Sequence, residues 1–303
     1  MYINRIVEKT LINNIKTNKV LIILGARQVG KTTLIKHFLG DKKLIFLNLD
    51  IEVDKARLIA VAKMSPQESV KALGNPDYII IDEAQRHLDT GQIVKGWFDA
   101  GIKTKIVLLG SSSLNLLNQT AESLTGRNEK IFLCPLLFRE VVITQSWYSE
   151  AFDEKQLHDN FSGQLNSLLI QSMIFGGYPE AVLTSDKESF LLNLSSDYLL
   201  KDVLQIGLVK TPESVKRLLM LLAHQVGSEV SINELAMNLG IGRQTVERYL
   251  ELLEQTFVIF RLPAFSTNQR KEISKSQKIY FWDTGIRNAI LKEFSTSAMR
   301  PDI

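Results

Sequence analysis

A polyphosphate-binding loop is indicated near the start of the chain. An apolar run ending at Leu24 leads into Gly25, and Gly30 follows five positions later with Lys31 and Thr32 directly behind it. A loop of this kind turns successive backbone N–H groups inward to hold phosphates. The lysine can reach the outer phosphates, and the threonine hydroxyl can coordinate Mg²⁺. The residues expected to line this site are Gly25, Ala26, Arg27, Gln28, Val29, Gly30, Lys31, Thr32 and Thr33.

A pair of acids in the segment YIIIDEAQ supports the same chemistry. Asp82 and Glu83 come at the end of a buried, strand-like run, where open α/β sheets bind their ligands. The first acid is expected to hold the Mg²⁺ shell, and the second to polarise an attacking water. A lone Asp-Glu pair would more often be a helix N-cap. The phosphate loop upstream favours the catalytic interpretation.

Two further segments contain groups that could complete the site. Ser111 and Ser112 follow the apolar run VLL and could contact the γ-phosphate or the water, although one of them could equally cap the next helix. Arg127 follows Gly126 in a predicted loop. An arginine stabilises phosphoryl transfer only if it reaches the γ-phosphate, from the same chain or from a neighbouring subunit of an oligomer. Both options stay open.

The first half of the chain alternates short apolar runs with helical patterns. Several runs are apolar throughout, which is typical of parallel strands covered on both faces. Strand–helix alternation predicts an α/β domain with a mostly parallel sheet, of the P-loop NTPase type. The predicted strands are Val20–Leu24, Leu44–Asp50, Tyr78–Asp82, Lys105–Leu109 and Lys130–Leu133, with helices over Thr32–Leu39 and Gln92–Ala100.

The second half is predicted to contain two further domains. Apolar residues at helical spacing from about Ser162 to Gly227 predict a helical subdomain. A helix from Ile232, a glycine turn at Gly240 to Gly242 and a helix from Arg243 follow, and then two strand-like segments joined by a basic loop. This order is that of a winged helix-turn-helix. We therefore expect domains at residues 1–150, 151–226 and 227–303, the last ending as a truncated domain would.

Double-stranded DNA is one expected partner of the winged helix. Basic residues on the second helix and in the loop could contact a phosphate backbone. Glu247, Glu251 and Glu254 lie on the same helix and oppose such binding. Packing against a protein therefore stays open as the alternative. The basic residues are Arg243, Arg248, Arg270, Lys271, Lys275 and Lys278.

Composition places the chain among ordinary globular proteins. Charged residues make up 23% and hydrophobic ones 45%, and the net charge of +3 permits an anionic partner without requiring one. The single cysteine, Cys134, excludes an internal disulfide framework and fits a reducing, cytoplasmic location. The longest apolar run, Ile131–Phe138, is too short to span a bilayer. We expect no membrane association.

Six motifs occur in a fixed order: GARQVGKTTL, NLD, IIDEAQ, GSSSLNLL, LTGR and PLLFRE. In this combination the chain resembles the predicted AAA-type ATPases of bacteria and archaea. The resemblance covers nearly its whole length. It implies that Lys31 and Thr32 are the Walker A residues and that Asp82 and Glu83 are the Walker B pair. By the same resemblance, Ser111 falls near the position of the family's first sensor, and Arg127 matches the arginine of the family's Gly-Arg motif. The chain departs from the family at Ala26, which is often Pro, and at Leu109, which is often Thr.

The expected function is Mg²⁺-dependent ATP hydrolysis by a switch or motor that acts with DNA. A nucleotide-gated regulator with slow hydrolysis and a winged helix used for protein contacts is the first alternative. A small-molecule kinase is the second, but the paired acids and the C-terminal winged helix argue against it. Members of the family often continue into a nuclease-like domain, which these 303 residues do not contain.

Overall fold

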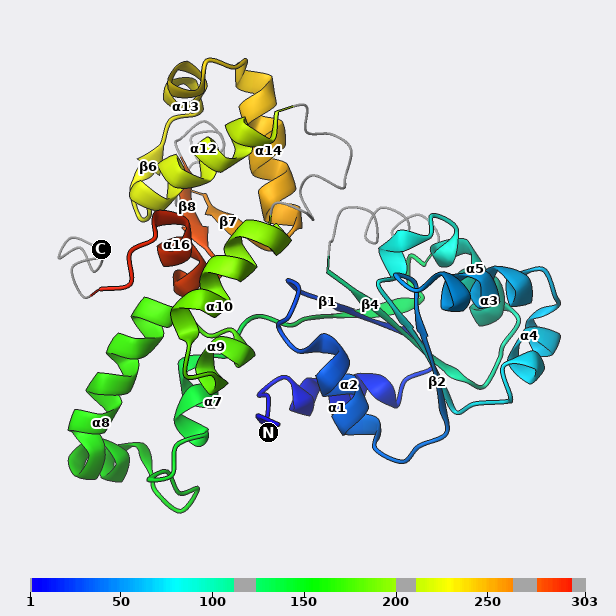
Figure 1. Cartoon of the computed structure of the whole chain (residues 1–303). Coiled ribbons are helices and arrows are strands. Elements are labelled where there is room, and N and C mark those ends of the chain that lie inside the picture. Colours follow the sequence, from blue (N-terminus) through cyan, green and yellow to red (C-terminus); the bar gives the residue numbers. More distant parts are fainter. Residues whose placement is uncertain (1, 112–123, 200–210, 264–276, 296–303) are drawn as a thin grey trace, which may run out of the picture. The chain divides into compact units, whose positions relative to one another are not determined.

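The chain divides into two compact units, Met1–Leu133 and Cys134–Ile303. The computed structural model describes residues 2–111, 124–199, 211–263 and 277–295 (Figure 1). These units differ from the sequence-based division at residues 150 and 226, since the helical region and the C-terminal region share one unit. Each unit is described below by itself.

The first unit is built on a five-stranded parallel sheet with the order β2-β3-β4-β1-β5. Each predicted strand is confirmed, with ends shifted by two residues or fewer. All residues of β1 are buried, as expected for a strand covered on both faces. The strands are β1 (Val20–Leu24), β2 (Leu44–Asn48), β3 (Tyr78–Asp82), β4 (Lys105–Gly110) and β5 (Asn128–Phe132).

Helices cover both faces of this sheet. Figure 1 shows α1 and α2 on one side of the strands, and α3, α4 and α5 on the other. Right-handed crossovers explain the division, because the chain crosses the sheet one way from β1 to β2 and returns from β2 through β3 to β4. The helices are α1 (Glu8–Ile15), α2 (Lys31–Leu39), α3 (Glu52–Ala62), α4 (Pro66–Ala72) and α5 (Thr90–Asp99), with a 3₁₀ turn, η1 (Ala84–Arg86), after β3.

The parallel arrangement gives the sheet two chemically distinct edges. Every strand ends at one of them, the carboxyl-terminal edge, and begins at the other, the amino-terminal edge. Gly25 follows β1, Glu83 follows β3 and Ser111 follows β4, so these three residues meet at the carboxyl-terminal edge. The sheet therefore gathers residues that are far apart in the sequence.

The second unit is mainly helical and ends in a small antiparallel sheet of order β6-β8-β7. The predicted helices from Ile232 and from Arg243 are confirmed, and Gly240 has the positive φ of 65° that ends the first of them. The helices are α7 (Phe138–Ile143), α8 (Glu154–Phe175), α9 (Pro179–Leu183), α10 (Lys187–Asn193), a π-helical segment η2 (Leu194–Leu199), α12 (Pro212–His224), α13 (Ile232–Leu239), α14 (Arg243–Gln255) and α16 (Thr284–Leu291). The strands are β6 (Glu229–Val230), β7 (Ile259–Leu262) and β8 (Gln277–Phe281).

A buried aspartate joins the two parts of the second unit that the sequence assigned to separate domains. Asp283 Oδ1 accepts a hydrogen bond from Ile286 N (3.0 Å) at the start of α16, and its Oδ2 accepts one from Gly177 N (2.7 Å) after α8. A Cβ on Gly176 would lie 2.1 Å from Asp283 Oδ1. The contact therefore requires glycine and packs α16 against the end of α8.

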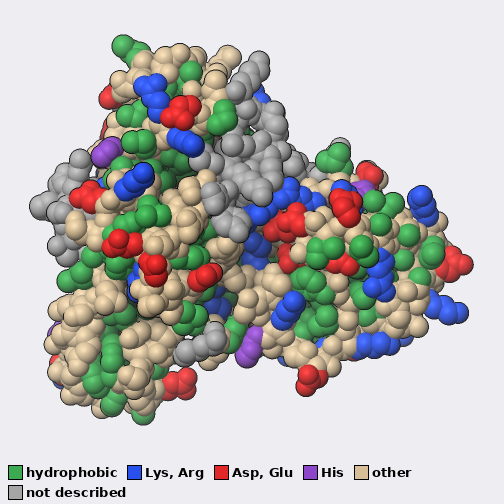
Figure 2. Space-filling model, viewed as in Figure 1, with side chains coloured by type: hydrophobic (Ala, Val, Ile, Leu, Met, Phe, Trp, Pro, Cys, Tyr) green, Lys and Arg blue, Asp and Glu red, His purple; other side chains and the backbone are tan. Residues whose placement is uncertain are grey.

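Charged side chains of both signs lie on the surface of the first unit. Figure 2 shows basic and acidic side chains interspersed over the visible face of the first unit. Within the part of the chain that the structure describes, none of the helices has the length and apolar character needed to cross a membrane.

Candidate functional site

The phosphate loop connects β1 to α2 at the carboxyl-terminal edge of the sheet. Gly25 lies against the chain after β5, where an added Cβ would be 2.1 Å from Leu133 O. Only glycine allows this close approach. Gln28 and Gly30 have positive φ values of 61° and 94°, and α2 begins at Lys31. These left-handed residues turn the loop so that it forms a cradle at the start of the helix, where backbone N–H groups bind anions.

The Lys31 side chain closes over this loop. Its Nζ donates hydrogen bonds to Gly25 O and Ala26 O, both at 2.9 Å. The residue is only 6% exposed. A buried ammonium that lies at the mouth of an anion cradle can move from carbonyl oxygens to phosphate oxygens with little rearrangement of the backbone. Lys31 therefore ties the end of the loop back to its beginning.

Thr32 joins the phosphate loop to the acid at the end of β3. Its Oγ1 donates a hydrogen bond of 2.7 Å to Asp82 Oδ2, and Asp82 Oδ1 accepts another from Glu83 N at 2.9 Å. Asp82 is 7% exposed. A hydroxyl and a carboxylate oxygen side by side are the hard donors that Mg²⁺ prefers. These two side chains fit a magnesium ion and would hold it.

Glu83 lies in a second polar cluster that continues from this point. Its backbone is left-handed (φ 52°, ψ 41°), which turns its side chain away from the line of the strand. Glu83 Oε2 accepts hydrogen bonds from Ser111 Oγ (2.9 Å) and from Gln85 Nε2. Gln85 Nε2 also lies 3.0 Å from Ser111 Oγ. The structure therefore brings together the acid and the serine that the sequence singled out.

Gln85 is a site residue that the sequence analysis missed. Glutamine alone suggests no chemistry, and only the turn η1 brings its amide back beside Glu83. The motif IIDEAQ contained the signal, because Gln85 is one of its six letters. Ser112, the other serine considered, lies outside the described residues.

Comparison with known proteins gives matches over the region that contains these residues. A family model described as an AAA domain matches residues 17–142, a range that contains both the loop and the paired acids. Residues 17–142 are therefore similar to an AAA domain, and this range is called the AAA domain from here on. A second model, described as a domain of unknown function, matches residues 166–297. The AAA domain thus includes almost all of the first unit after α1.

Relatives of the chain extend beyond this domain. The uncharacterized protein MJ1544 of Methanocaldococcus jannaschii is 30% identical over 298 residues, which make up 93% of this chain and 63% of that protein. The uncharacterized protein Rv2008c of Mycobacterium tuberculosis is 30% identical over 278 residues, or 90% of this chain and 56% of that one. The chain therefore spans less than two thirds of the length of these relatives.

A solved structure confirms the fold. The Walker-type ATPase PABY2304 of Pyrococcus abyssi matches with a TM-score of 0.65 at 15% identity, and the match covers 96% of each chain. The AAA model over residues 17–142 and the fold shared with this structure together support a resemblance to AAA-type P-loop ATPases.

Arg127 lies at the wrong edge of the AAA domain to act on the phosphate site of its own chain. Its carbonyl oxygen accepts a hydrogen bond from Val20 N (2.9 Å), at the start of β1. Its Nε donates to Asp99 Oδ1 (2.7 Å) at the end of α5. The length of β1, about 16 Å for its five residues, separates this position from the loop. Of the two options left open by the sequence, action of Arg127 within its own chain does not fit, because Arg127 precedes β5 and so lies where strands begin. Action across a subunit interface stays a prediction.

Two other arginines lie at the correct edge. Arg86 Nε is 2.6 Å from Asp50 Oδ1, and Arg27 Nη2 is 3.9 Å from Asp50 Oδ2. Asp50 follows β2, Arg27 lies in the phosphate loop and Arg86 ends η1. The sequence analysis placed Arg27 in the loop but missed Arg86, since a lone arginine after the acids gave no separate signal. The AAA domain therefore holds two guanidinium groups beside its phosphate loop.

Proposed function

We propose that this protein hydrolyses ATP at the carboxyl-terminal edge of the AAA domain, with Mg²⁺ as cofactor. The observation that carries the proposal is the 2.7 Å hydrogen bond between Thr32 Oγ1 and Asp82 Oδ2. It joins the phosphate loop to the acids after β3, although the two residues are 50 positions apart. Bound Mg²⁺ would supply positive charge against the phosphate oxygens.

Each residue of the site has a separate task in this proposal. The N–H groups of the loop bind the phosphates, and the Lys31 ammonium neutralises the outer ones. Glu83 orients a water molecule, whose oxygen forms a bond to the γ-phosphorus as the bond to the ADP oxygen breaks. The proton of that water passes to the Glu83 carboxylate. Gln85 and Ser111 both donate to Glu83 Oε2 and so fix the direction of this carboxylate.

Binding and turnover can be tested separately on the full chain. Calorimetry should detect Mg-ATP binding, and Lys31→Ala should weaken it by roughly 10- to 150-fold, because a charge-assisted hydrogen bond contributes about 1.5–3 kcal/mol. Phosphate release should accompany binding by the unaltered chain. A folded protein that binds no Mg-ATP would overturn the proposal.

We further propose that the C-terminal part of the second unit is a winged helix through which the ATPase acts on duplex DNA. The order α12, β6, α13, α14, β7, β8 and the sheet order β6-β8-β7 support this assignment. Arg248 on α14 and Lys278 on β8 are exposed and can face a phosphate backbone. Arg270, Lys271 and Lys275 of the predicted basic loop lie outside the described residues.

One observation favours the alternative, a nucleotide-gated regulator that hydrolyses ATP slowly and contacts a protein. Arg243, at the start of α14, pairs with Glu247 at 3.1 Å. Arg261 on β7 pairs with Glu254. The first pair neutralises a cation of α14 and the second neutralises a cation of β7, so both reduce the positive charge that this region can offer to DNA.

The rate of ATP hydrolysis with and without duplex DNA separates the two functions. Stimulation that disappears in the double variant Arg248→Glu, Lys278→Glu supports the DNA-acting ATPase. A slow rate that duplex DNA does not change supports the regulator. Lys155→Glu with Lys216→Glu, which removes two exposed lysines of the same unit, is the charge-matched control.

A further inference from the structure

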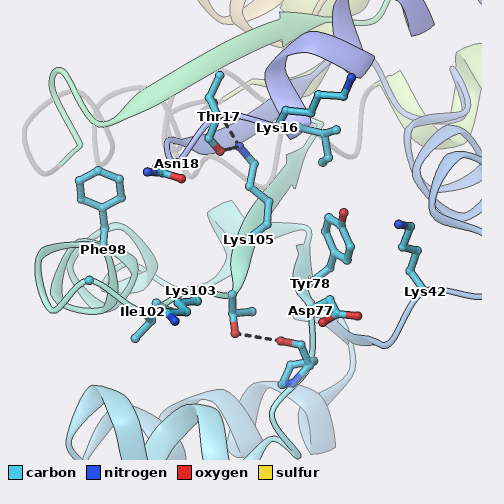
Figure 3. A pocket seen from close by; sticks show the side chains of 14 residues that line it. Lys16, Thr17, Asn18, Lys42, Asp77, Tyr78, Phe98, Ile102, Lys103 and Lys105 are labelled. Atoms are coloured by element: carbon cyan, nitrogen blue, oxygen red, sulfur yellow. Dashed lines mark hydrogen bonds between the residues drawn. The ribbon is translucent and has the colours of Figure 1, made fainter.

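A second concave site lies at the amino-terminal edge of the same sheet. It is a groove of about 860 Å³, within the range of about 300–1,000 Å³ typical of ligand pockets (Figure 3). Its walls come from the start of β3, the start of β4 and the connections that lead into β1 and β2. Because the strands are parallel, the groove is separated from the phosphate loop by the length of a strand. The groove is therefore a separate site from the phosphate-binding loop.

The rim of this groove is rich in lysine. Four lysines line it, against Asp77 as the single carboxylate among the described lining residues, which gives a local charge of +3. The whole chain has the same net charge of +3. Lys16, Lys42 and Lys103 are exposed, and their ammonium groups form no ion pair or hydrogen bond with the described residues. Three unneutralised cations around one groove indicate an anionic ligand.

The walls of the groove are held in place by hydrogen bonds. Lys105 Nζ donates to Asn14 O (2.8 Å), Thr17 O (2.7 Å) and Lys19 O (2.6 Å), which fixes the connection from α1 to β1. Figure 3 shows Lys105 reaching Thr17. Thr104 Oγ1 donates to Pro76 O at 2.8 Å and ties the approaches to β3 and β4 together. Burial lowers the pKa of Lys105 to about 8. The fourth lysine is therefore part of the wall, whereas the other three are available.

Aromatic rings lie in the groove together with the lysines. Figure 3 shows the rings of Tyr78 and Phe98 on different sides of Lys105. Both residues are half-buried, so part of each ring reaches the surface. Base stacking on an aromatic ring contributes about 1–3 kcal/mol per base and requires base faces that are not already stacked in a duplex.

We propose that this groove binds single-stranded nucleic acid, with Lys16, Lys42 and Lys103 on the phosphates and the rings of Tyr78 and Phe98 on the bases. A duplex would present phosphates but no free base faces to the rings. An acidic peptide would satisfy the lysines and leave the rings without a specific partner. Cations combined with rings in one concave site favour the single strand over both.

The proposal does not depend on ATP hydrolysis or on the winged helix. The groove lies entirely within the first unit, and none of its residues belongs to the phosphate site. Loss of ATP binding would therefore leave it untouched, and failure of the groove would leave the ATPase untouched.

The test measures binding of a fluorescent oligodeoxythymidylate of eight nucleotides to the full chain, with excess Mg-ATP present to occupy the phosphate loop. We expect the triple variant Lys16→Glu, Lys42→Glu, Lys103→Glu to bind at least about ten-fold more weakly. The slope of log affinity against log salt should fall by about 2, since each single-strand phosphate contact contributes about 0.7. Tyr78→Ala should weaken binding as well while keeping that slope.

The matched control is the triple variant Lys9→Glu, Lys63→Glu, Lys155→Glu, which removes three exposed lysines that do not line the groove. It changes the net charge of the chain by the same amount and should retain binding. Equal losses in both triple variants would overturn the proposal, because binding would then follow net charge alone. Competition by poly-glutamate as strong as by the oligonucleotide would also overturn it. An equal loss of affinity for a duplex of the same length in the groove variant would overturn it too, because the groove would then bind phosphates alone.

Discussion

The two edges of the parallel sheet in the first unit differ in how their charged groups are satisfied. At the carboxyl-terminal edge Lys31 is held by loop carbonyls, Thr32 by Asp82, and Glu83 by Ser111 and Gln85. At the amino-terminal edge three lysines that line the groove have ammonium groups without a partner in the described residues. One sheet therefore presents a closed network at one edge and an open cationic surface at the other.

This difference shows what each edge requires of a ligand. Side chains held by hydrogen bonds are preorganised, so a ligand gains contacts without the entropy cost of ordering them, but it must replace existing hydrogen bonds. Exposed lysines replace only water when they bind an anion, and their contacts weaken with salt. We expect substitutions at the carboxyl-terminal edge to change Mg-ATP binding or turnover, and those at the amino-terminal edge to change stability or the affinity of the groove for its ligand.

The largest effect is expected from Glu83→Gln at the closed edge. The amide cannot accept the proton of the attacking water, so turnover should fall by roughly 10²- to 10⁴-fold while Mg-ATP binding is retained. Phosphate release and calorimetry on the same preparation check both parts. Unchanged turnover would remove Glu83 from the mechanism.

Thr32→Val should have the next largest effect. Loss of the hydroxyl removes one ligand for Mg²⁺ and leaves the buried Asp82 carboxylate without one of its donors, which costs about 1–3 kcal/mol. Mg-ATP affinity should fall by roughly ten-fold or more, measured by calorimetry over a series of Mg²⁺ concentrations. Thr32→Ser keeps a hydroxyl and should restore most of the affinity. Equal losses in both variants would contradict the assigned role.

Gln85→Ala should produce a smaller change, confined to turnover. The substitution removes the amide that donates to the Glu83 carboxylate and contacts Ser111. A hydrogen bond to a charged group contributes about 1.5–3 kcal/mol, but Ser111 still donates to the same oxygen, so the loss should fall below this range. We expect kcat to fall by roughly 2- to 12-fold with KM nearly constant. Gln92→Ala, on the exposed side of α5, is the control and should match the unaltered chain. A change in KM alone would argue against a positioning role.

Lys105→Met tests the amino-terminal edge through stability. Burial lowers the pKa of Lys105 from 10.5 to about 8, so the folded chain binds fewer protons than the unfolded chain between these pH values. The contribution of this lysine to the free energy of unfolding therefore rises as pH increases from about 8 to 10.5. In urea unfolding at pH 7.5, 9 and 10, the free energy of unfolding of the unaltered chain should increase relative to that of Lys105→Met. A difference independent of pH would show that burial does not perturb this group.

The smallest effect is expected from Arg127→Ala. Its exposed pair with Asp99 contributes at most about 1 kcal/mol to stability. Because Arg127 lies at the amino-terminal edge, turnover in dilute solution should not change. Loss of turnover that appears only as the protein concentration rises would support action across a subunit interface. Loss of turnover at every protein concentration would contradict the placement of Arg127 at the amino-terminal edge.

Much of the first unit could be predicted because its signals are local. The strands up to β4 show as apolar runs, and the loop from Gly25 to Thr32 has a fixed spacing that its backbone conformation requires. Arg127 shows the limit of such reasoning. Its position after a glycine suggested a loop near the phosphates, but the edge at which a loop lies depends on whether it precedes or follows a strand. Gln85 shows a second limit. The sequence analysis did not name it as a site residue, because its role depends on a turn that the sequence does not mark.

The domain boundaries were less predictable for a similar reason. The helical and C-terminal regions differ in pattern, which suggested a division near residue 226. Asp283 and the glycines at 176 and 177 join them through contacts between residues more than 100 positions apart. Patterns along the chain do not report such packing.

The sequence alone determined the phosphate loop, the acids after β3 and the parallel sheet, because local spacing and continuous apolar runs encode them. Tertiary structure decided which side chains share an edge of that sheet. It placed Gln85 beside Glu83, put Arg127 at the far edge and gathered Lys16, Lys42 and Lys103 around one groove. The physical reason is that strand order and direction arise from packing of the whole unit, and no single segment of the sequence contains them.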